Sequence, residues 1–269
     1  MIRYKRIKLP LILTFFACFL LVFFASVRNS DDIPVNANEN KLKTIVLDAG
    51  HGGEDPGCVG LNGELEKEIN LKIVKNLEEI LLFSGFNVVL TRNEDISIHD
   101  NGITGLRNQK VSDMQNRKKI VDSYPDSIFL SIHQNQFTSP QIFGAQMFYS
   151  ENSEDNLKLA QTLQKNFRDL DQDNNREVKI IDNGLYLFKN SVQPSVLIEC
   201  GFLSNPKDVA NLGNNEYQKM VSFTIYKSLL EYIEEVSDRT VSSEESQRKE
   251  VNEIKDVLYM QSDHLTVGG

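Results

Sequence analysis

The segment Thr44–Gly53, with the sequence TIVLDAGHGG, constrains this chain more than any other. It begins as a largely apolar run of strand length and ends abruptly in glycines around one histidine, His51. Such a run closed by glycines predicts a buried strand that leads into a loop at the edge of a sheet. Loops at that edge carry the chemistry of α/β proteins, so His51 is the first candidate site residue.

Three roles fit a histidine in such a loop. A phosphate-binding cradle is weakly supported, because neither G-x-G-x-x-G nor a G-K-[ST] ending is present. A structural histidine bonded to a neighbouring carbonyl is the ordinary outcome for a lone histidine. A metal ligand needs partners elsewhere in the chain, and the sequence supplies them.

A second apolar run, Ser127–Leu130, leads to His133, so a second strand is expected to end in a histidine. Between the two histidines an amphipathic helical pattern opens with the acidic residues Glu64, Glu66 and Glu68. Acidic residues in a first turn usually complement the helix dipole, which we expect of Glu64 and Glu68, and Glu66 is the candidate ligand. Two imidazoles and one carboxylate are a common ligand set for catalytic zinc, with the fourth position open to water.

Glu199 ends a further apolar run, Pro194–Ile198. Burial of a carboxylate at a strand end raises its pKa toward the range that is useful for proton transfer. The alternative is a glutamate that pairs with an arginine or caps the helix expected near Asn205. Because two other strand ends carry His51 and His133, the sequence favours the catalytic interpretation.

Taken together, these segments resemble the zinc-dependent N-acetylmuramoyl-L-alanine amidases of the amidase 3 type, from about residue 43 to about residue 236. Four motifs in the family's order carry the resemblance, and they lie around His51, Glu66, His133 and Glu199. The resemblance implies that the two histidines and Glu66 bind one Zn²⁺ and that Glu199 is the catalytic acid and base. Residues 106–117 look most like the sporulation branch of the family, which trims spore-cortex peptidoglycan.

Two residues depart from the family pattern. Gln134 stands where the family usually has a small residue, and Cys200 stands where it usually has an aliphatic one. Both flank the expected site, so they would alter pocket shape or rate without removing a ligand. Cys58 and Cys200 are expected to be free thiols, with a single disulfide between them as the alternative. Cys200 as a nucleophile is a rival role, but a thiolate needs a base, and the histidines are better used on metal.

Three polar residues near the motifs are candidates for substrate binding: Asn135, Arg92 and Arg117. Muropeptides carry carboxylates, and a guanidinium binds a carboxylate in a bidentate way. Structural pairing of the two arginines with acidic neighbours is the alternative. His99 and His264 lie in polar sequence and are expected to be solvated.

The two ends of the chain differ from its middle. In residues 1–28, basic residues precede an uncharged apolar stretch, which predicts a signal sequence or a membrane anchor. The residues around Ala25 form a poor cleavage site, which favours an anchor. Residues 29–42 are expected to form a linker, 43–236 the catalytic domain, and 237–269 a hydrophilic C-terminal tail with at most a short helix at 251–259. We therefore expect export to the outer face of a bacterial cytoplasmic membrane.

Strand-like and helical segments alternate along the domain, which predicts an α/β fold with helices on both faces of the sheet. The family resemblance implies that the sheet is mixed, with about six strands in a single catalytic domain. The segments 143–149 and 185–188 are expected to be strands, and 217–233 a closing helix. The net charge of −9 disfavours a nucleic-acid partner, because phosphate contacts need clustered basic residues.

The function implied by the resemblance is zinc-dependent hydrolysis of the amide between N-acetylmuramic acid and L-alanine in peptidoglycan, in spore-cortex maturation. Spacing alone supports only metal-assisted hydrolysis. A zinc peptidase or deacetylase of the envelope is a rival enzyme. A scaffold of the same fold, either non-catalytic or activated by an accessory protein, is the alternative from another class.

Overall fold

The computed structural model describes residues 43–171, 173–181 and 185–265. These residues form a mixed six-stranded sheet with the strand order β2-β1-β3-β6-β4-β5, which confirms the predicted fold class. The pair β4 and β6 is antiparallel, and the other neighbouring strands are parallel. The strands are β1 (Thr44–Ala49), β2 (Asn87–Leu90), β3 (Ile128–Asn135), β4 (Gln146–Tyr149), β5 (Lys179–Ile180) and β6 (Ser195–Phe202).

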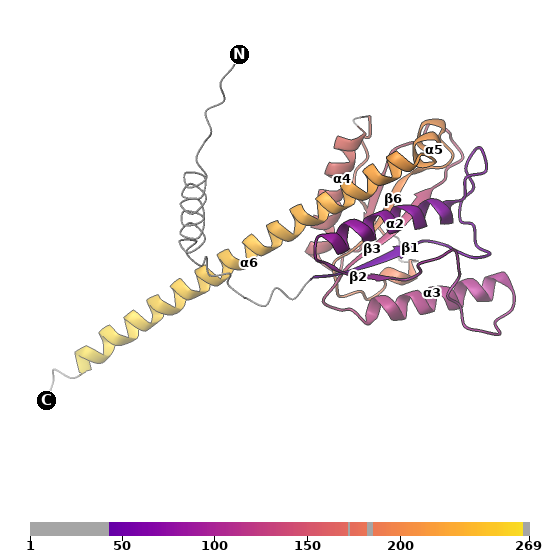
Figure 1. Cartoon of the computed structure of the whole chain (residues 1–269). Coiled ribbons are helices and arrows are strands. Elements are labelled where there is room, and N and C mark those ends of the chain that lie inside the picture. Colours follow the sequence, from indigo (N-terminus) through magenta and orange to yellow (C-terminus); the bar gives the residue numbers. More distant parts are fainter. Residues whose placement is uncertain (1–42, 172, 182–184, 266–269) are drawn as a thin grey trace, which may run out of the picture. The chain divides into compact units, whose positions relative to one another are not determined.

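Helices cover both faces of this sheet (Figure 1). One face carries α2 (Glu66–Phe83), α4 (Glu154–Leu170) and the start of α6 (Asn215–Leu265), and α2 and α4 each pack against α6. The short helix α5 (Pro206–Leu212) lies beside β6 and α6. The other face carries α3 (Leu106–Asp122), which packs against the 3₁₀ turn η1 (Tyr186–Phe188).

Two hydrophobic cores follow from the alternation of side chains along the strands. Ile45 and Leu47 of β1 belong to the larger core under α2, α4 and α6, whereas Val46 between them belongs to the smaller core. Phe129 of β3 packs against Phe188 of η1 in that smaller core, with their ring centroids 5.3 Å apart. Strands buried on both faces explain why β1, β3 and β6 are nearly continuous apolar runs rather than alternating ones.

The carboxyl ends of β1, β3 and β6 meet at one edge of the sheet, because these strands are parallel. Ala49 pairs with Ile132, and His133 pairs with Glu199. A register irregularity lies between His133 and Asn135. The topology therefore brings together the strand ends that the sequence singled out.

Three local expectations differ from the structure. The segment expected to be a strand at 185–188 is the 3₁₀ turn η1, because two of its apolar side chains, Leu187 and Phe188, are buried by a turn rather than by strand pairing. The sequence predicts helical spacing at 113–121 and a loop at 96–110, but the helix α3 begins at Leu106, inside that segment. The two-residue strand β5 was not predicted.

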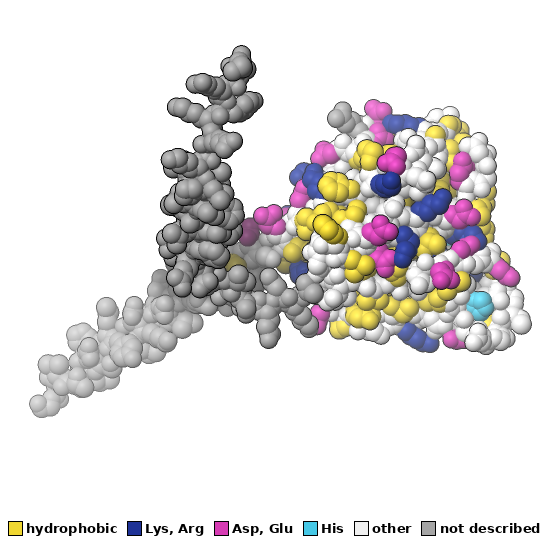
Figure 2. Space-filling view, viewed as in Figure 1, with side chains coloured by type: hydrophobic (Ala, Val, Ile, Leu, Met, Phe, Trp, Pro, Cys, Tyr) yellow, Lys and Arg dark blue, Asp and Glu magenta, His cyan; other side chains and the backbone are white. Residues whose placement is uncertain are grey.

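The C-terminal region also differs from its prediction. The helix α6 continues unbroken from Asn215 to Leu265, where a tail with a short helix was expected. The expected signal or anchor and the linker, residues 1–42, lie outside the described residues. None of the helices in the described part of the chain is long and apolar enough to cross a membrane. Acidic and basic side chains are interspersed over the face of the domain seen in Figure 2.

Candidate active site

The loop after β1 presents His51 in a strained backbone conformation. Its φ angle is 62°, in the left-handed region that few residues other than glycine adopt. Such strain persists only where the surroundings enforce it, and it is concentrated at functional sites. The glycine before His51 is also required, because a Cβ at Gly50 would lie 2.2 Å from the ring of His133. The loop sequence therefore brings two imidazoles together.

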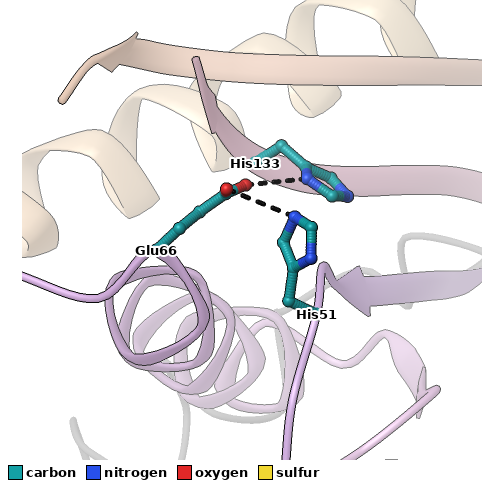
Figure 3. Close-up of side chains that lie close together, drawn as sticks. All are labelled: His51, Glu66 and His133. Atoms are coloured by element: carbon teal, nitrogen blue, oxygen red, sulfur yellow. Dashed lines mark hydrogen bonds and ion pairs between the residues drawn. The ribbon is translucent and has the colours of Figure 1, made fainter. Parts of the chain in front are cut away.

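Glu66, the first residue of α2, lies between these two imidazoles (Figure 3). Its Oε2 lies 3.2 Å from His51 Nε2, and its Oε1 lies 2.9 Å from His133 Nδ1. The two rings meet edge to face with their centroids 4.9 Å apart. One ligand atom from each of the three side chains lies within 4.8 Å of the others, so the group could hold a metal ion.

Backbone donors fix the Glu66 carboxylate. Cys58 N donates to Oε2 at 2.7 Å, and Gln134 N donates to Oε1 at 3.0 Å. The loop comes this close because residue 57 is glycine, where a Cβ would lie 2.5 Å from Glu66 Oε2. A carboxylate held by two amides is oriented before any ligand arrives, which favours binding by reducing the ordering that binding requires.

The charges of this group are complementary. Burial lowers the pKa of His51, but hydrogen bonds to Asp55 and Glu66 outweigh it and raise the pKa to about 9. Burial would raise the pKa of Glu66, yet hydrogen bonds to His133 and His51 hold it well below its usual range. The other ring nitrogen of His51, Nδ1, lies 2.8 Å from Asp55 Oδ2. Lys110 Nζ lies 2.7 Å from the second oxygen of Asp55, Oδ1. An imidazole with its second nitrogen held by a carboxylate is the usual arrangement of a metal-binding histidine.

Glu199 lies across from His133 on the neighbouring strand. Its side chain is half-buried, and its Oε2 atom is buried and has no hydrogen-bond partner among the described residues. Burial, together with the nearby charge of Glu66, raises the pKa of Glu199 to about 7 against the opposing effect of the histidines. A carboxyl group with that pKa can both accept and return a proton near neutral pH.

Arg92 and Arg117, which the sequence offered as substrate ligands, are buried against the backbone of the His51 loop. Arg92 donates to the carbonyls of Ala49 and Gly50 at 2.8 and 3.1 Å. Arg117 donates to the carbonyls of Ala49 and His51 at 2.7 and 2.6 Å. The two guanidinium groups therefore donate hydrogen bonds to three consecutive backbone carbonyls, those of Ala49, Gly50 and His51, where the loop adopts its strained conformation.

The negative charge that balances Arg117 is one that sequence reasoning did not single out. Asp48 is 1% exposed and accepts hydrogen bonds from Arg117, Thr91 and Ser131, each at 2.7 Å. Although burial opposes it, Arg117 lowers the pKa of Asp48 to about 2. An aspartate inside an apolar strand, three residues before His51, was the only sequence signal for this network.

The third substrate candidate, Asn135, ends β3 half-buried, and its side-chain oxygen accepts from Gln136 N at 2.8 Å. A cleft of about 520 Å³ opens beside His51 and His133. His99, which the sequence predicted to be solvated, lines this cleft and contacts Ser97 Oγ at 2.8 Å. Cys58 and Cys200 are free thiols.

A mixed α/β sheet with two imidazoles and a carboxylate at the carboxyl ends of its strands, and a second carboxylate of raised pKa beside them, is typical of a metal-assisted hydrolase. The chain belongs to the N-acetylmuramoyl-L-alanine amidase family, whose model matches residues 45–231. It is therefore an enzyme that cleaves the amide between N-acetylmuramic acid and L-alanine in peptidoglycan, as the family resemblance of the sequence implied.

Individual amidases that are similar to this chain in sequence or structure support the family assignment. The germination-specific N-acetylmuramoyl-L-alanine amidase of Bacillus subtilis is 34% identical over 234 residues, which cover 87% of this chain and 98% of that protein. The CwlD amidase of Clostridioides difficile, solved in complex with the GerS lipoprotein, is 40% identical with a TM-score of 0.69, covering 71% of this chain and 98% of that one. The catalytic domain of the CwlV amidase from Bacillus (Paenibacillus) polymyxa is 28% identical with a TM-score of 0.60, covering 72% and 99%.

Proposed function

We propose that this amidase is zinc-dependent and acts on spore-cortex peptidoglycan. The two histidines and Glu66 would hold one Zn²⁺, and Glu199 would be the catalytic acid and base. The observation that carries this proposal is the convergence of a three-residue donor set with a buried, unpaired carboxylate oxygen on the adjacent strand. The donor set fits zinc, because two imidazoles and one carboxylate leave a coordination position for water or substrate.

When bound, zinc supplies a Lewis acid that polarises the amide carbonyl and acidifies water. Glu199 takes a proton from the attacking water and returns a proton to the departing amine, so one carboxyl group serves both steps. Its pKa of about 7 suits this exchange. Asp55 holds His51 through Nδ1, which leaves Nε2 directed at Glu66.

For Arg92 and Arg117 we propose a positioning role in place of substrate binding. Each guanidinium already donates to loop carbonyls, and Arg117 is also paired with Asp48 and Asp113. These bonds stabilise the left-handed conformation of His51 and so fix the direction of its imidazole. Asn135 stays a candidate for substrate contact, since it lies at the strand end next to His133.

The cortex assignment rests on two relatives. One is named as germination-specific, and the other is an amidase solved with a lipoprotein. By analogy with the second, we propose that an accessory envelope protein assists this chain as well. Export to the outer face of the cytoplasmic membrane follows from the location of the substrate and from the predicted segment at 1–28.

The test is product analysis with zinc-loaded protein and purified cortex peptidoglycan. Wild type should generate new L-alanine amino termini, and Glu199→Gln should lower the rate by roughly 10²–10⁴ while still binding zinc. Glu68→Gln, which changes an exposed carboxylate in the same turn as Glu66, is the matched control and should keep full activity. Release of acetate or cleavage of a peptide bond would identify a deacetylase or peptidase instead, and an unchanged rate in Glu199→Gln would remove Glu199 from the mechanism.

A further inference from the structure

His99 lies in the wall of the cleft that opens beside the metal-binding group, and no step of the proposed mechanism uses it. Its ring nitrogen Nδ1 lies 2.8 Å from Ser97 Oγ, which lines the same cleft. The other ring nitrogen, Nε2, forms no hydrogen bond among the described residues. Nε2 is therefore the polar atom that this ring offers to a molecule bound in the cleft.

The hydrogen bonds behind the ring decide which form Nε2 takes. Asp113 is ion-paired with Arg117, whose Nε lies 2.7 Å from Asp113 Oδ2, so this carboxylate can only accept hydrogen bonds. Ser97 Oγ therefore donates its single proton to Asp113 Oδ1, at 3.0 Å. His99 Nδ1 must then donate to Ser97 Oγ, which places the proton of the neutral ring on Nδ1 and leaves a free lone pair on Nε2. The ring thus presents a hydrogen-bond acceptor to the cleft.

The backbone on both sides of His99 is fixed to α3. Ile98 N donates to Asp113 Oδ1 at 2.7 Å. Asp100 N donates to Ser112 Oγ at 3.0 Å. Because these bonds are made within the protein alone, a ligand that binds in the cleft does not have to order this loop, and binding is favoured accordingly.

The same network joins His99 to the metal-binding group. Arg117 Nη2 donates to the His51 carbonyl at 2.6 Å, while Arg117 Nε donates to Asp113. One guanidinium group therefore positions the two loops that carry the imidazoles of His51 and His99. A fixed spacing between a metal ligand and a hydrogen-bond acceptor suits a substrate that is held at one point and cleaved at another.

The charges that line the cleft indicate which part of the substrate lies there. Glu54 and Asp95 are exposed acidic residues of the lining, and Lys110 is an exposed basic one. On the glycan side of the scissile amide the substrate is uncharged, because the lactyl carboxyl group of muramic acid is itself part of that amide. The stem peptide carries the charged groups, and its N–H groups are donors for an imidazole acceptor. The lining is therefore complementary to the stem peptide.

We propose that His99 is a substrate-binding residue whose Nε2 accepts a hydrogen bond from an N–H group of the stem peptide beyond L-alanine. Ser97 and Asp113 are positioning residues that hold the imidazole in its accepting form. This inference deepens the proposed function, on which it rests, by assigning the cleft beside α3 to the peptide. A contact made equally in the ground state and the transition state acts on KM more than on kcat.

The experiment measures kcat and KM of the zinc-loaded full chain on soluble muramoyl peptides. His99→Phe keeps a ring but removes the acceptor, so it should raise KM by roughly tenfold while kcat stays within about twofold of wild type. His99→Gln places a carbonyl oxygen near the position of Nε2 and should restore most of the loss. Asn101→Ala, an exposed change in the same loop, is the control and should keep the wild-type KM.

Two series of substrates identify the group that His99 contacts. Shortening the stem peptide to L-alanine alone should largely abolish the KM penalty of His99→Phe, because the donor is then missing in wild type as well. Shortening the glycan to one muramic acid should leave the penalty unchanged. A penalty that follows the length of the glycan would overturn the assignment of the cleft to the peptide.

Ser97→Ala tests the positioning role. It removes the acceptor of Nδ1, so the neutral ring can carry its proton on either nitrogen, and KM should rise several-fold. Nitrogen NMR of histidine-labelled protein distinguishes protonated from unprotonated ring nitrogens. At a pH at which the ring is neutral, it should show Nε2 unprotonated in wild type and a mixture in the variant. A wild-type ring with its proton on Nε2 would contradict the proposal.

The kinetics can overturn the inference in two further ways. A KM of His99→Phe within about twofold of wild type would show that His99 does not contact the substrate. A raised KM that His99→Gln leaves unrestored would show that the ring fills space in the cleft and is not an acceptor. Failure of zinc-loaded wild type to cleave any muramoyl peptide would instead overturn the proposed function, and this inference with it.

Discussion

At the scale of single residues, the metal-free site already holds an ion pair where a cation would bind. The pKa of His51 is raised to about 9 while that of Glu66 is held far below its usual range, so at neutral pH the imidazole carries a proton beside a carboxylate. This proton keeps the ligands close together before metal arrives. A zinc ion bound here, as we propose, would displace it, because only the neutral imidazole is a ligand.

Zinc binding should therefore release protons. At neutral pH, below the raised pKa, His51 is protonated in the metal-free protein and neutral when it binds metal, so about one proton should leave this residue on binding. Zinc affinity should accordingly fall as the pH falls. Calorimetry in buffers of different ionisation enthalpy measures the number released.

Asp55→Asn provides the comparison for that measurement. It removes the carboxylate whose hydrogen bond is the largest single cause that raises the pKa of His51, so fewer protons should leave on binding. A binding enthalpy that is independent of the buffer would show that His51 is already neutral, which would contradict the ion pair.

The sequence predicted the main residues of this site because each of them follows or begins a strongly patterned element. His51, His133 and Glu199 end apolar runs, and Glu66 opens an amphipathic helix. Pairing with acidic neighbours, the alternative that the sequence offered for the two arginines, agrees with the ion pairs of Arg117 with Asp48 and Asp113. The contacts of both arginines with the loop could not be predicted in the same way, because the groups bound there are backbone carbonyls. Backbone carbonyls cannot be recognised in a sequence, and only the fold brings them within reach of Arg92, which follows β2, and of Arg117 on α3.

At the scale of elements, Arg117 joins the helix α3 to the end of β1. It donates from one guanidinium group to Asp48, to Asp113 and to two loop carbonyls. A buried ion pair of this kind is not by itself strongly stabilising, because both charges lose their hydration. Removing one member is costly, since the other is then left buried and unpaired.

Arg117→Leu should therefore destabilise the metal-free protein by about 3–5 kcal/mol, measured by urea unfolding. Asp48 would remain buried without its cation, and the left-handed loop around His51 would lose two of its donors. Lys119→Leu, an exposed change on the same helix, should stay within about 0.5 kcal/mol of wild type. An unfolding midpoint for Arg117→Leu equal to that of the control would show that the loop holds its conformation without this arginine.

The elements that were mispredicted share a physical cause. The four apolar residues at 185–188 satisfy a buried strand and a buried turn equally well, and the sequence gives no period that separates the two. β5 is only two residues long, too short for any pattern, and it exists because Tyr149 accepts a bond from Ile181 N at 2.7 Å. α3 was placed too late because its first turn carries polar residues, whose helical state depends on the packing of the rest of the helix.

At the scale of the whole molecule, α6 has two parts that differ in how far their side chains are buried. Its N-terminal part packs on α2 and α4, with Leu229 and Tyr232 among its last fully buried residues, and Val236 partly buried. From Ser237 onward the described side chains are exposed. The sequence prediction of a hydrophilic tail thus described the composition of this segment but not its helical conformation. A helix that is already formed in the core can continue into the segment without a new nucleation step, so the cost of nucleation is avoided.

Deleting residues 243–269 should therefore leave the catalytic domain intact. Because the buried residues of α6 precede the deletion, the thermal midpoint of the domain should change by less than about 2 °C, and the rate on peptidoglycan fragments should be unchanged. The full chain should show additional helical circular dichroism that declines gradually on heating, before the cooperative transition. A deletion of residues 229–269, which also removes Leu229 and Tyr232, is the control and should abolish cooperative folding. If the shorter deletion instead lowers the midpoint by many degrees, the C-terminal part of α6 is held by contacts of its own, and the boundary of the folded domain lies beyond residue 242.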